Sequence, residues 1–242
     1  MSPEQPDGAE QIHPYARVIA LADAARYEEA VAALEEYVRP EPQFAAAYRQ
    51  LAFLYYARVN RPDLGIEALK TVLELEPGYA PDLLTLGRLY DNAERYAEAE
   101  ETYLKAYHLA PAKREVGAVA LIQIGWLYAR LGRDKEAFIV FHRATLNAPD
   151  DPSPRYGLGY LHARAGDMGA ALAAYRTTAR IRNDYEIAYK AMADALKTMG
   201  DHALAETISK KLEQTKALSQ EVTQRWAKLA GMVSGEGSES AK

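Results

Sequence analysis

The residue types that most often carry catalysis or bind metals are few in this chain, and their spacing suits neither task. Cysteine is absent, which excludes disulfides, thiolate metal sites and a cysteine nucleophile. The glycine-rich stretches 157–159 and 231–237 lack the following Lys-Ser or Lys-Thr of a phosphate-binding loop. We therefore expect no catalytic residues, no metal and no cofactor. The five histidines form no H-x-x-x-H pair and no H-E-x-x-H motif; they are His13, His108, His142, His162 and His202.

Binding is the chemistry that the remaining side chains favour. Arginine presents forked donors to carboxylates, and aromatic rings give large contact areas at low entropic cost. The chain contains 17 tyrosines. Which of these side chains could act together depends on the elements that hold them.

Those elements follow an internal repeat. Six small residues recur, each followed twelve positions later by the end of an apolar helical run, at intervals of 35, 34, 38, 34 and 34 residues. A period of this length predicts a solenoid, in which each unit buries its apolar face against its neighbours. The small residues are Ala30, Gly65, Ala99, Ala137, Ala171 and Ala205, and the runs end at Pro42, Pro77, Pro111, Pro149, Asn183 and Ala217.

Each repeat is predicted to hold two amphipathic helices. In the third repeat one apolar stripe runs from Leu83 to Tyr90 at three- and four-residue steps, and a second runs from Tyr96 to Ala106. Gly or Ala at positions 52, 87, 125, 159 and 193 is expected to let the two helices of a unit approach closely. The interval of 38 residues, between the third and fourth units, predicts one of two features around residues 113–117. Either the first helix of the fourth unit is longer, or the surface turn before it is longer.

These residues resemble the tetratricopeptide repeat (TPR) family. The matching features are L-G-x-x-Y in the first helix, G-x-x-x-x-A around the turn, an aromatic residue four positions after that Ala, and a closing Pro. The resemblance implies an all-α, right-handed α-solenoid of about six helix-turn-helix units, at residues 11–44, 45–79, 80–117, 118–151, 152–185 and 186–217. We expect a flexible segment at 1–10, a capping helix at 218–232 and a flexible tail at 233–242.

The resemblance also implies that the first helices line a concave, peptide-binding surface. Cations outnumber acids in the residues carried over by helical phase, so we expect an acidic and apolar peptide along units three to six, centred on Trp126, Arg130, Tyr160 and Arg164. The alternative is that these side chains are solvated or pack against neighbours. The predicted groove residues are Arg49, Phe53, Tyr56, Arg88, Asn92, Gln123, Trp126, Arg130, Tyr156, Tyr160, Arg164, Lys190 and Lys197.

Some TPR domains bind the acidic C-termini of chaperones through a two-carboxylate clamp of Lys, Asn and Arg residues. None of the four possible frames in this chain supplies that set; the first, for example, gives Tyr15, Ile19, Gln50, Pro81 and Thr85. A role of that kind is therefore not expected.

Charge and hydropathy restrict the kinds of partner and the compartment that we expect. The net charge of −5 argues against nucleic acid as a partner, and no apolar run is long enough to cross a membrane. The first residues carry no secretory signal, so a cytoplasmic protein is expected. We predict a non-catalytic scaffold or adaptor for a protein partner. The alternatives are a self-associating scaffold or assembly chaperone, and, as a minor one, an RNA-binding helical repeat.

Overall fold

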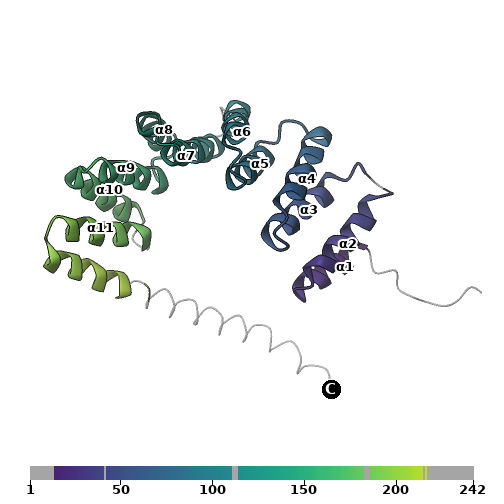
Figure 1. The fold of residues 1–242 in the computed structure, drawn as a ribbon, viewed down its shortest axis with the longest axis horizontal. Helices are drawn as coiled ribbons and strands as arrows, with labels where there is room; N and C mark the ends of the chain where they lie inside the picture. The colour runs from purple at the N-terminus through teal and green to yellow at the C-terminus, as the bar shows by residue number, and fades with distance from the viewer. Residues whose placement is uncertain (1–13, 41, 111–113, 183–185, 215, 217–242) are drawn as a thin grey trace, which may run out of the picture. The chain divides into compact units, whose positions relative to one another are not determined.

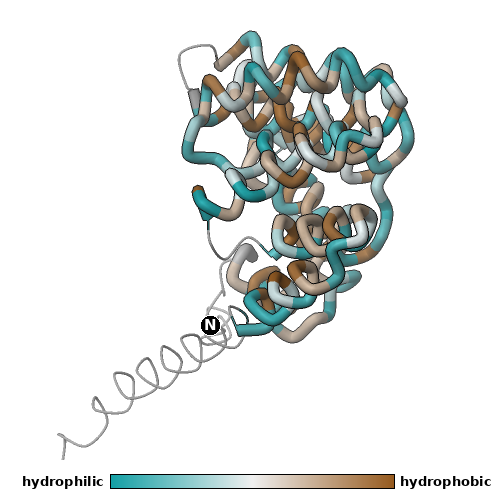
Figure 2. The backbone as a smooth tube through the Cα atoms, turned by 90° about the vertical axis from the view of Figure 1, so that its left-hand side faces the viewer, coloured by the Kyte–Doolittle hydropathy of each residue, from teal (hydrophilic) through white to brown (hydrophobic). Residues whose placement is uncertain are grey.

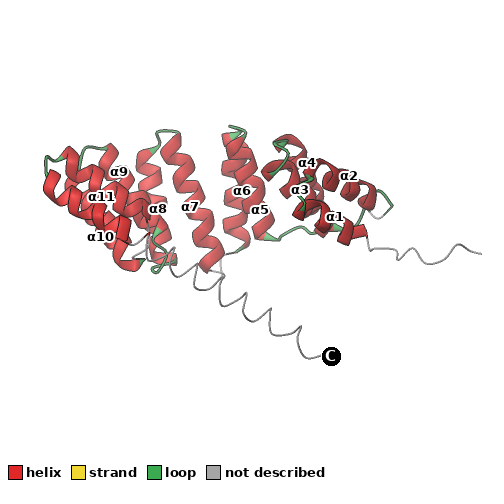
Figure 3. Cartoon of the chain, turned by 90° about the horizontal axis from the view of Figure 1, so that it is seen from below, coloured by secondary structure: helices red, strands yellow, loops and turns green. Residues whose placement is uncertain are grey.

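The computed structural model describes residues 14–40, 42–110, 114–182, 186–214 and 216. Within these residues the regular elements are all helices, as Figure 3 shows, so the prediction of an all-α fold is confirmed. A further helical segment covers residues 202–214. The labelled helices are α1 (Pro14–Asp23), α2 (Tyr27–Val38), α3 (Ala45–Ala57), α4 (Pro62–Leu75), α5 (Ala80–Asn92), α6 (Tyr96–Leu109), α7 (Arg114–Arg130), α8 (Asp134–Asn147), α9 (Ser153–Arg164), α10 (Met168–Ile181) and α11 (Glu186–Thr198).

The helices fall into two compact units, residues 1–127 and 128–242, and each is described by itself. In the first unit, successive helices from α1 to α6 pack against one another in chain order (Figure 1). In the second unit α8 packs on α9, α9 on α10 and α10 on α11. Contacts between chain neighbours are what a helical-repeat protein requires.

Apolar stripes explain why these segments are helical and how they pack. In α5, Pro81 lies in the first turn, where its missing N–H would have no helical partner, and Leu83, Leu86 and Leu89 are buried on one side. Hydrophobic and hydrophilic residues alternate along the helices in the same manner (Figure 2). Each buried Leu contributes about 1.5–3 kcal/mol relative to an exposed one.

Close helix contacts occur at two of the predicted small positions. A methyl group on Gly87 would lie 2.5 Å from the ring of Tyr103, and one on Gly159 would lie 2.5 Å from the ring of Tyr175. Each of these glycines therefore provides the space that a tyrosine ring of the second helix occupies against the first helix. The expectation of close approach is confirmed at positions 87 and 159.

The first helices end in a shared turn. A residue with left-handed backbone follows the helix. At five of the six turns the next N–H donates to the carbonyl five residues back, as from Arg95 to Tyr90 at 2.8 Å and from Arg133 to Tyr128 at 2.9 Å, whereas after Asn60 the Arg61 N–H donates to the Tyr55 carbonyl, six residues back, at 2.7 Å. This is the Schellman arrangement, which satisfies carbonyls at a helix end. The left-handed residues recur at intervals of 35, 34, 38, 34 and 34, five positions before the small residues; they are Ala25, Asn60, Glu94, Gly132, Gly166 and Gly200.

An arginine-glutamate pair fixes the start of three second helices. The arginine Nε donates to a glutamate three residues later at 2.7 Å in α2, 2.6 Å in α6 and 2.8 Å in α8. Two of these arginines also stack on the last tyrosine of the preceding first-helix motif, Arg95 on Tyr90 at 4.6 Å and Arg133 on Tyr128 at 3.9 Å. The pairs are Arg26–Glu29, Arg95–Glu98 and Arg133–Glu136.

The long interval in the middle of the chain lengthens a helix. α7 contains 17 residues, whereas α3 and α5 each contain 13. Four extra residues add about one turn and leave the apolar face in phase. The predicted segments 1–10, 218–232 and 233–242 lie outside the described residues, and the six repeat limits stay predictions.

Candidate functional site

A pocket of about 460 Å³ lies between α3 and α5 in the first unit. Its floor is apolar and buried, formed by Ala52, Leu69 and Leu89. Phe53 and Tyr56 stand at its edge, with 49% and 42% of their surfaces exposed. Such exposed aromatic side chains over an apolar floor are typical of binding sites. The lining residues are Arg49, Ala52, Phe53, Tyr56, Leu69, Asp82, Thr85, Arg88 and Leu89.

One end of this pocket is closed by an ion-pair network around Arg49. Its Nε donates to both oxygens of Asp82, at 3.0 and 2.9 Å, and its Nη2 donates to Asp82 at 2.7 Å and to Glu76. The guanidinium also stacks on Tyr79 at 5.3 Å. The hydrogen bonds that Arg49 donates to Asp82 and Glu76 raise the pKa of Arg49 above its ordinary value. Arg49 therefore holds α3 to the start of α5 and neutralises the buried Asp82 carboxylate.

The other end carries different chemistry. Asn92 Nδ2 donates to the Tyr56 hydroxyl at 2.9 Å, and Thr85 donates to the Pro81 carbonyl at 2.9 Å. Arg88 is exposed and makes no ion pair or hydrogen bond with any described residue. Arg58 stacks on Phe53 at 5.6 Å and likewise has no carboxylate partner within the described ranges. Positive charge is thus left available at this end.

Five of the predicted groove residues therefore come together in the first unit: Arg49, Phe53, Tyr56, Arg88 and Asn92. Two more, Gln123 and Trp126, are half-buried on α7 and do not line this pocket. Trp126 belongs to the first unit, whereas Arg130, Tyr160 and Arg164 belong to the second. The cluster that these four residues were expected to form is thus divided between separately described units.

In the second unit most predicted groove residues have partners within the chain. Tyr156 packs on Tyr175 with ring centroids 5.5 Å apart, as part of the hydrophobic core. Arg164 donates to the Ala129 carbonyl at 2.5 Å and pairs with Asp134 at 3.0 Å. Arg130 and Tyr160 are exposed, on α7 and α9 respectively. His162 of α9 meets Phe138 of α8 edge-on, with the ring centroids 5.4 Å apart.

The predicted excess of groove cations is smaller than the phase count suggested. Four of the six counted cations form ion pairs: Arg49 with Asp82 and Glu76, Arg164 with Asp134, Lys190 with Glu186 at 2.8 Å, and Lys197 with Asp194 at 3.6 Å. Most of these acids were left out of the count because they lie on other helices or at helix starts.

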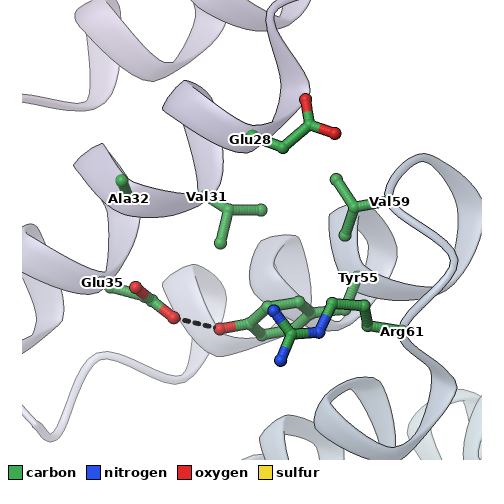
Figure 4. Close-up of a pocket in the computed structure, with 7 residues that line it drawn as sticks. All are labelled: Glu28, Val31, Ala32, Glu35, Tyr55, Val59 and Arg61. Atoms are coloured by element: carbon green, nitrogen blue, oxygen red, sulfur yellow. Dashed lines mark hydrogen bonds between the residues drawn. The ribbon is translucent and has the colours of Figure 1, made fainter.

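A second, smaller pocket of about 220 Å³ lies between α2 and the end of α3 (Figure 4). The Tyr55 hydroxyl donates to Glu35, and burial together with this bond raises the pKa of Tyr55. Val31 and Val59 face each other across the opening. Because its central polar groups already bind each other, this pocket offers less to a ligand than the α3–α5 pocket.

Sequence reasoning missed the acidic part of the site. Asp82 lies in the first turn of α5, and it forms the closed end of the pocket through a contact 33 residues away in sequence. One signal was present: Arg49 and Asp82 are separated by about one repeat, so the next first helix brings them side by side. Among the described residues no cluster of His, Asp and Glu could hold a metal ion, and no helix there is long and apolar enough to span a membrane.

Stacked helix pairs with an aromatic-edged pocket define a helical-repeat binding protein. A tetratricopeptide repeat family model matches residues 51–114 and 124–186, more than half of the chain. The chain therefore belongs to the tetratricopeptide repeat family, and the resemblance seen in its motifs is confirmed.

Solved structures with the same fold include three named proteins. PilW, a widely conserved type IV pilus biogenesis factor, is 21% identical with a TM-score of 0.66, covering 90% of this chain and 100% of its own. MamA is 22% identical with a TM-score of 0.57, covering 71% and 97%. YrrB, described as a TPR protein with an unusual peptide-binding site, is 18% identical with a TM-score of 0.50, covering 76% and 92%. No curated protein matches the chain by sequence.

Proposed function

We propose that this TPR protein is a non-catalytic adaptor that binds a peptide segment of a protein partner on its first-helix surface. The observation that carries the proposal is the α3–α5 pocket, where Phe53 and Tyr56 stay exposed over an apolar floor. A free monomer gains nothing from exposing two large aromatic rings beside each other, whereas a bound peptide would bury them.

Two further points support a binding role. The TPR family is generally made of non-catalytic scaffolds, and YrrB is described as having a peptide-binding site. The composition and motifs of the chain offer no nucleophile with its base.

The test is capture of partners from native lysate by the immobilised protein, followed by mass spectrometry. Phe53→Ala and Tyr56→Ala should each reduce recovery of the partner several-fold, because truncating a central aromatic anchor costs about 2 kcal/mol or more. Ile187→Ala on α11 is the matched control, since Ile187 is 50% exposed, close to the exposure of Phe53, and is distant in sequence from the pocket. Equal recovery by all three variants would count against the proposal.

Self-association is the second candidate. Ile139 and Leu146 lie seven residues apart on α8 and are 66% and 69% exposed, so one apolar stripe of this helix is open to a partner. Light scattering over a range of protein concentrations distinguishes the candidates, because a strict monomer excludes a self-associating scaffold. The same preparation can be tested for RNA affinity, where strong salt dependence would support the minor alternative.

A further inference from the structure

The α3–α5 pocket has a direction. The Arg49–Asp82 bonds join the two helices near their starts, and the Asn92–Tyr56 bond joins them near their ends. The helices therefore run side by side in the same sense, with the ion-pair network at one end and Arg88 toward the other. Six residues separate Asp82 from Arg88, about 9 Å along the helix.

Some polar side chains of the pocket already have hydrogen-bond or ion-pair partners within the protein, and others do not. Asp82 accepts three hydrogen bonds from Arg49, and Thr85 is bound to its own helix. Arg88 has no ion-pair or hydrogen-bond partner among the described residues, whereas Arg58, which does not line the pocket, stacks on Tyr27 at 5.2 Å and on Phe53 at 5.6 Å. A guest that entered the apolar floor without a negative charge would leave Arg88 partly desolvated and unpaired, which is unfavourable.

The backbone decides which kind of carboxylate fits. Terminal carboxylates are commonly captured by nests of free backbone N–H groups. Residues 49–56 and 85–89 lie inside α3 and α5, where backbone N–H groups are bound to the preceding turn. The site therefore offers a side-chain guanidinium and no backbone nest, which favours an Asp or Glu side chain within a peptide.

We propose that the α3–α5 pocket binds an internal peptide segment that places a large apolar side chain on Ala52, Leu69 and Leu89 and an Asp or Glu carboxylate against Arg88. This inference rests on the proposed function and adds the chemistry of the partner. It moves the expected contact from units three to six to the second and third units.

The probe is a phage library of random twelve-residue peptides, selected on the full-length protein in low salt. Peptides enriched on the wild type should carry one large apolar residue and one Asp or Glu at a fixed spacing. Selection on Arg88→Glu should lose this acidic preference and favour Lys or Arg. Arg176→Glu on α10 is the matched control, an exposed arginine in the second unit, and should retain the acidic preference.

Synthetic peptides then separate the two sources of negative charge. A peptide capped at both ends should bind the wild type about three- to tenfold more tightly than its Glu→Gln counterpart does. The two peptides should bind the Arg88→Gln variant with equal affinity. If the Gln peptide regains affinity when its C-terminus is left as a free acid, a terminal carboxylate is the true ligand and the inference is wrong.

The outcomes distinguish this inference from the proposed function. Enriched peptides that need Phe53 but show no acidic preference overturn the inference and leave peptide binding standing. If no enriched peptide depends on Phe53 or Tyr56, both the inference and the proposed function are overturned. Arg88 is exposed and unpaired among described residues, so circular dichroism should show that the Arg88 variants fold like the wild type.

Discussion

Two glycines show how single atoms set the distance between helices. Gly87 faces Tyr103 and Gly159 faces Tyr175, and in both pairs the same ring carbon, Cε1, would lie 2.5 Å from an added methyl group. Tyr103 is fully buried and Tyr175 is 4% exposed, so neither ring has free space to move into. The same contact is thus used in both units.

Gly87→Ala should therefore destabilise the protein by about 1–3 kcal/mol through overpacking, less the gain of up to about 1 kcal/mol in helix propensity. Urea unfolding followed by circular dichroism measures the change. Gly169→Ala is the control, because an added methyl there meets only Asp167 Oδ1 at 3.7 Å and should be neutral or slightly stabilising. Equal effects of the two substitutions would contradict the packing argument.

Tyr175 also gives the protein a specific response to high pH. Burial raises its pKa from 10 to about 12, with nearby Tyr156 and Tyr160 adding to the shift. Between these values the hydroxyl of the unfolded chain ionises while that of the folded chain stays neutral. The free energy of unfolding should therefore be unaffected below pH 10 and fall by up to about 1.4 kcal/mol per pH unit above it.

Urea unfolding of the wild type and of Tyr175→Phe at pH 9 to 11.5 tests this expectation. The variant should lose stability less steeply with rising pH, although Tyr55, whose pKa is also raised, keeps part of the dependence. Parallel curves for the two proteins would exclude a contribution from Tyr175.

At the scale of the element, the shared turn is supplied by unlike residues. Gly132, Gly166 and Gly200 adopt positive φ without strain, whereas Ala25 and Glu94 hold the same conformation with a side chain present. A left-handed residue other than glycine costs about 1–2 kcal/mol. The turns of the first unit therefore carry backbone strain that the glycine turns of the second unit do not.

Glu94→Gly should stabilise the protein by about 0.5–1 kcal/mol, since relief of strain outweighs the added freedom of the unfolded chain. Gly166→Ala should destabilise it by about 1 kcal/mol or more, and because nothing lies within 4 Å of the added methyl, the effect reports conformation alone. Thermal unfolding provides the measurement. The stability changes caused by Glu94→Gly and Gly166→Ala must have opposite signs, and changes of the same sign would contradict the strain argument.

Sequence patterns predicted the helix pairs because their period and apolar stripes are local properties. The glycine turns belong to the G-x-x-x-x-A motif, but the same turn at Ala25 and Glu94 was hidden by residue types that do not favour a left-handed backbone. Of the pocket residues, Phe53, Tyr56 and Arg88 were placed in the expected groove by the family resemblance together with helical phase. The ion pairing of Arg49 was missed, since phase on one helix contains no information about the acids that a neighbouring helix brings to it.

At the scale of the whole molecule, a repeat array should transmit damage mainly to chain neighbours. Gly159→Leu should lower amide protection most in α9 and α10 and least in α3 and α4. Gly87→Leu should give the reverse pattern, with the largest loss in α5 and α6. Hydrogen exchange with mass spectrometry of both variants is the measurement, and uniform loss over all helices in both would indicate one cooperative unit.

The arginine-glutamate pairs bear on how such a chain is assembled. Each joins residues three apart, and Arg95 and Arg133 reach back five residues to a tyrosine, so the turn between the two helices is held by contacts within a short stretch of chain. Closure over short distances is fast and depends little on the rest of the chain. Because these turn contacts are made within one hairpin, we expect that inserting another copy would lengthen the first-helix surface by one helix while leaving the existing turns unaltered.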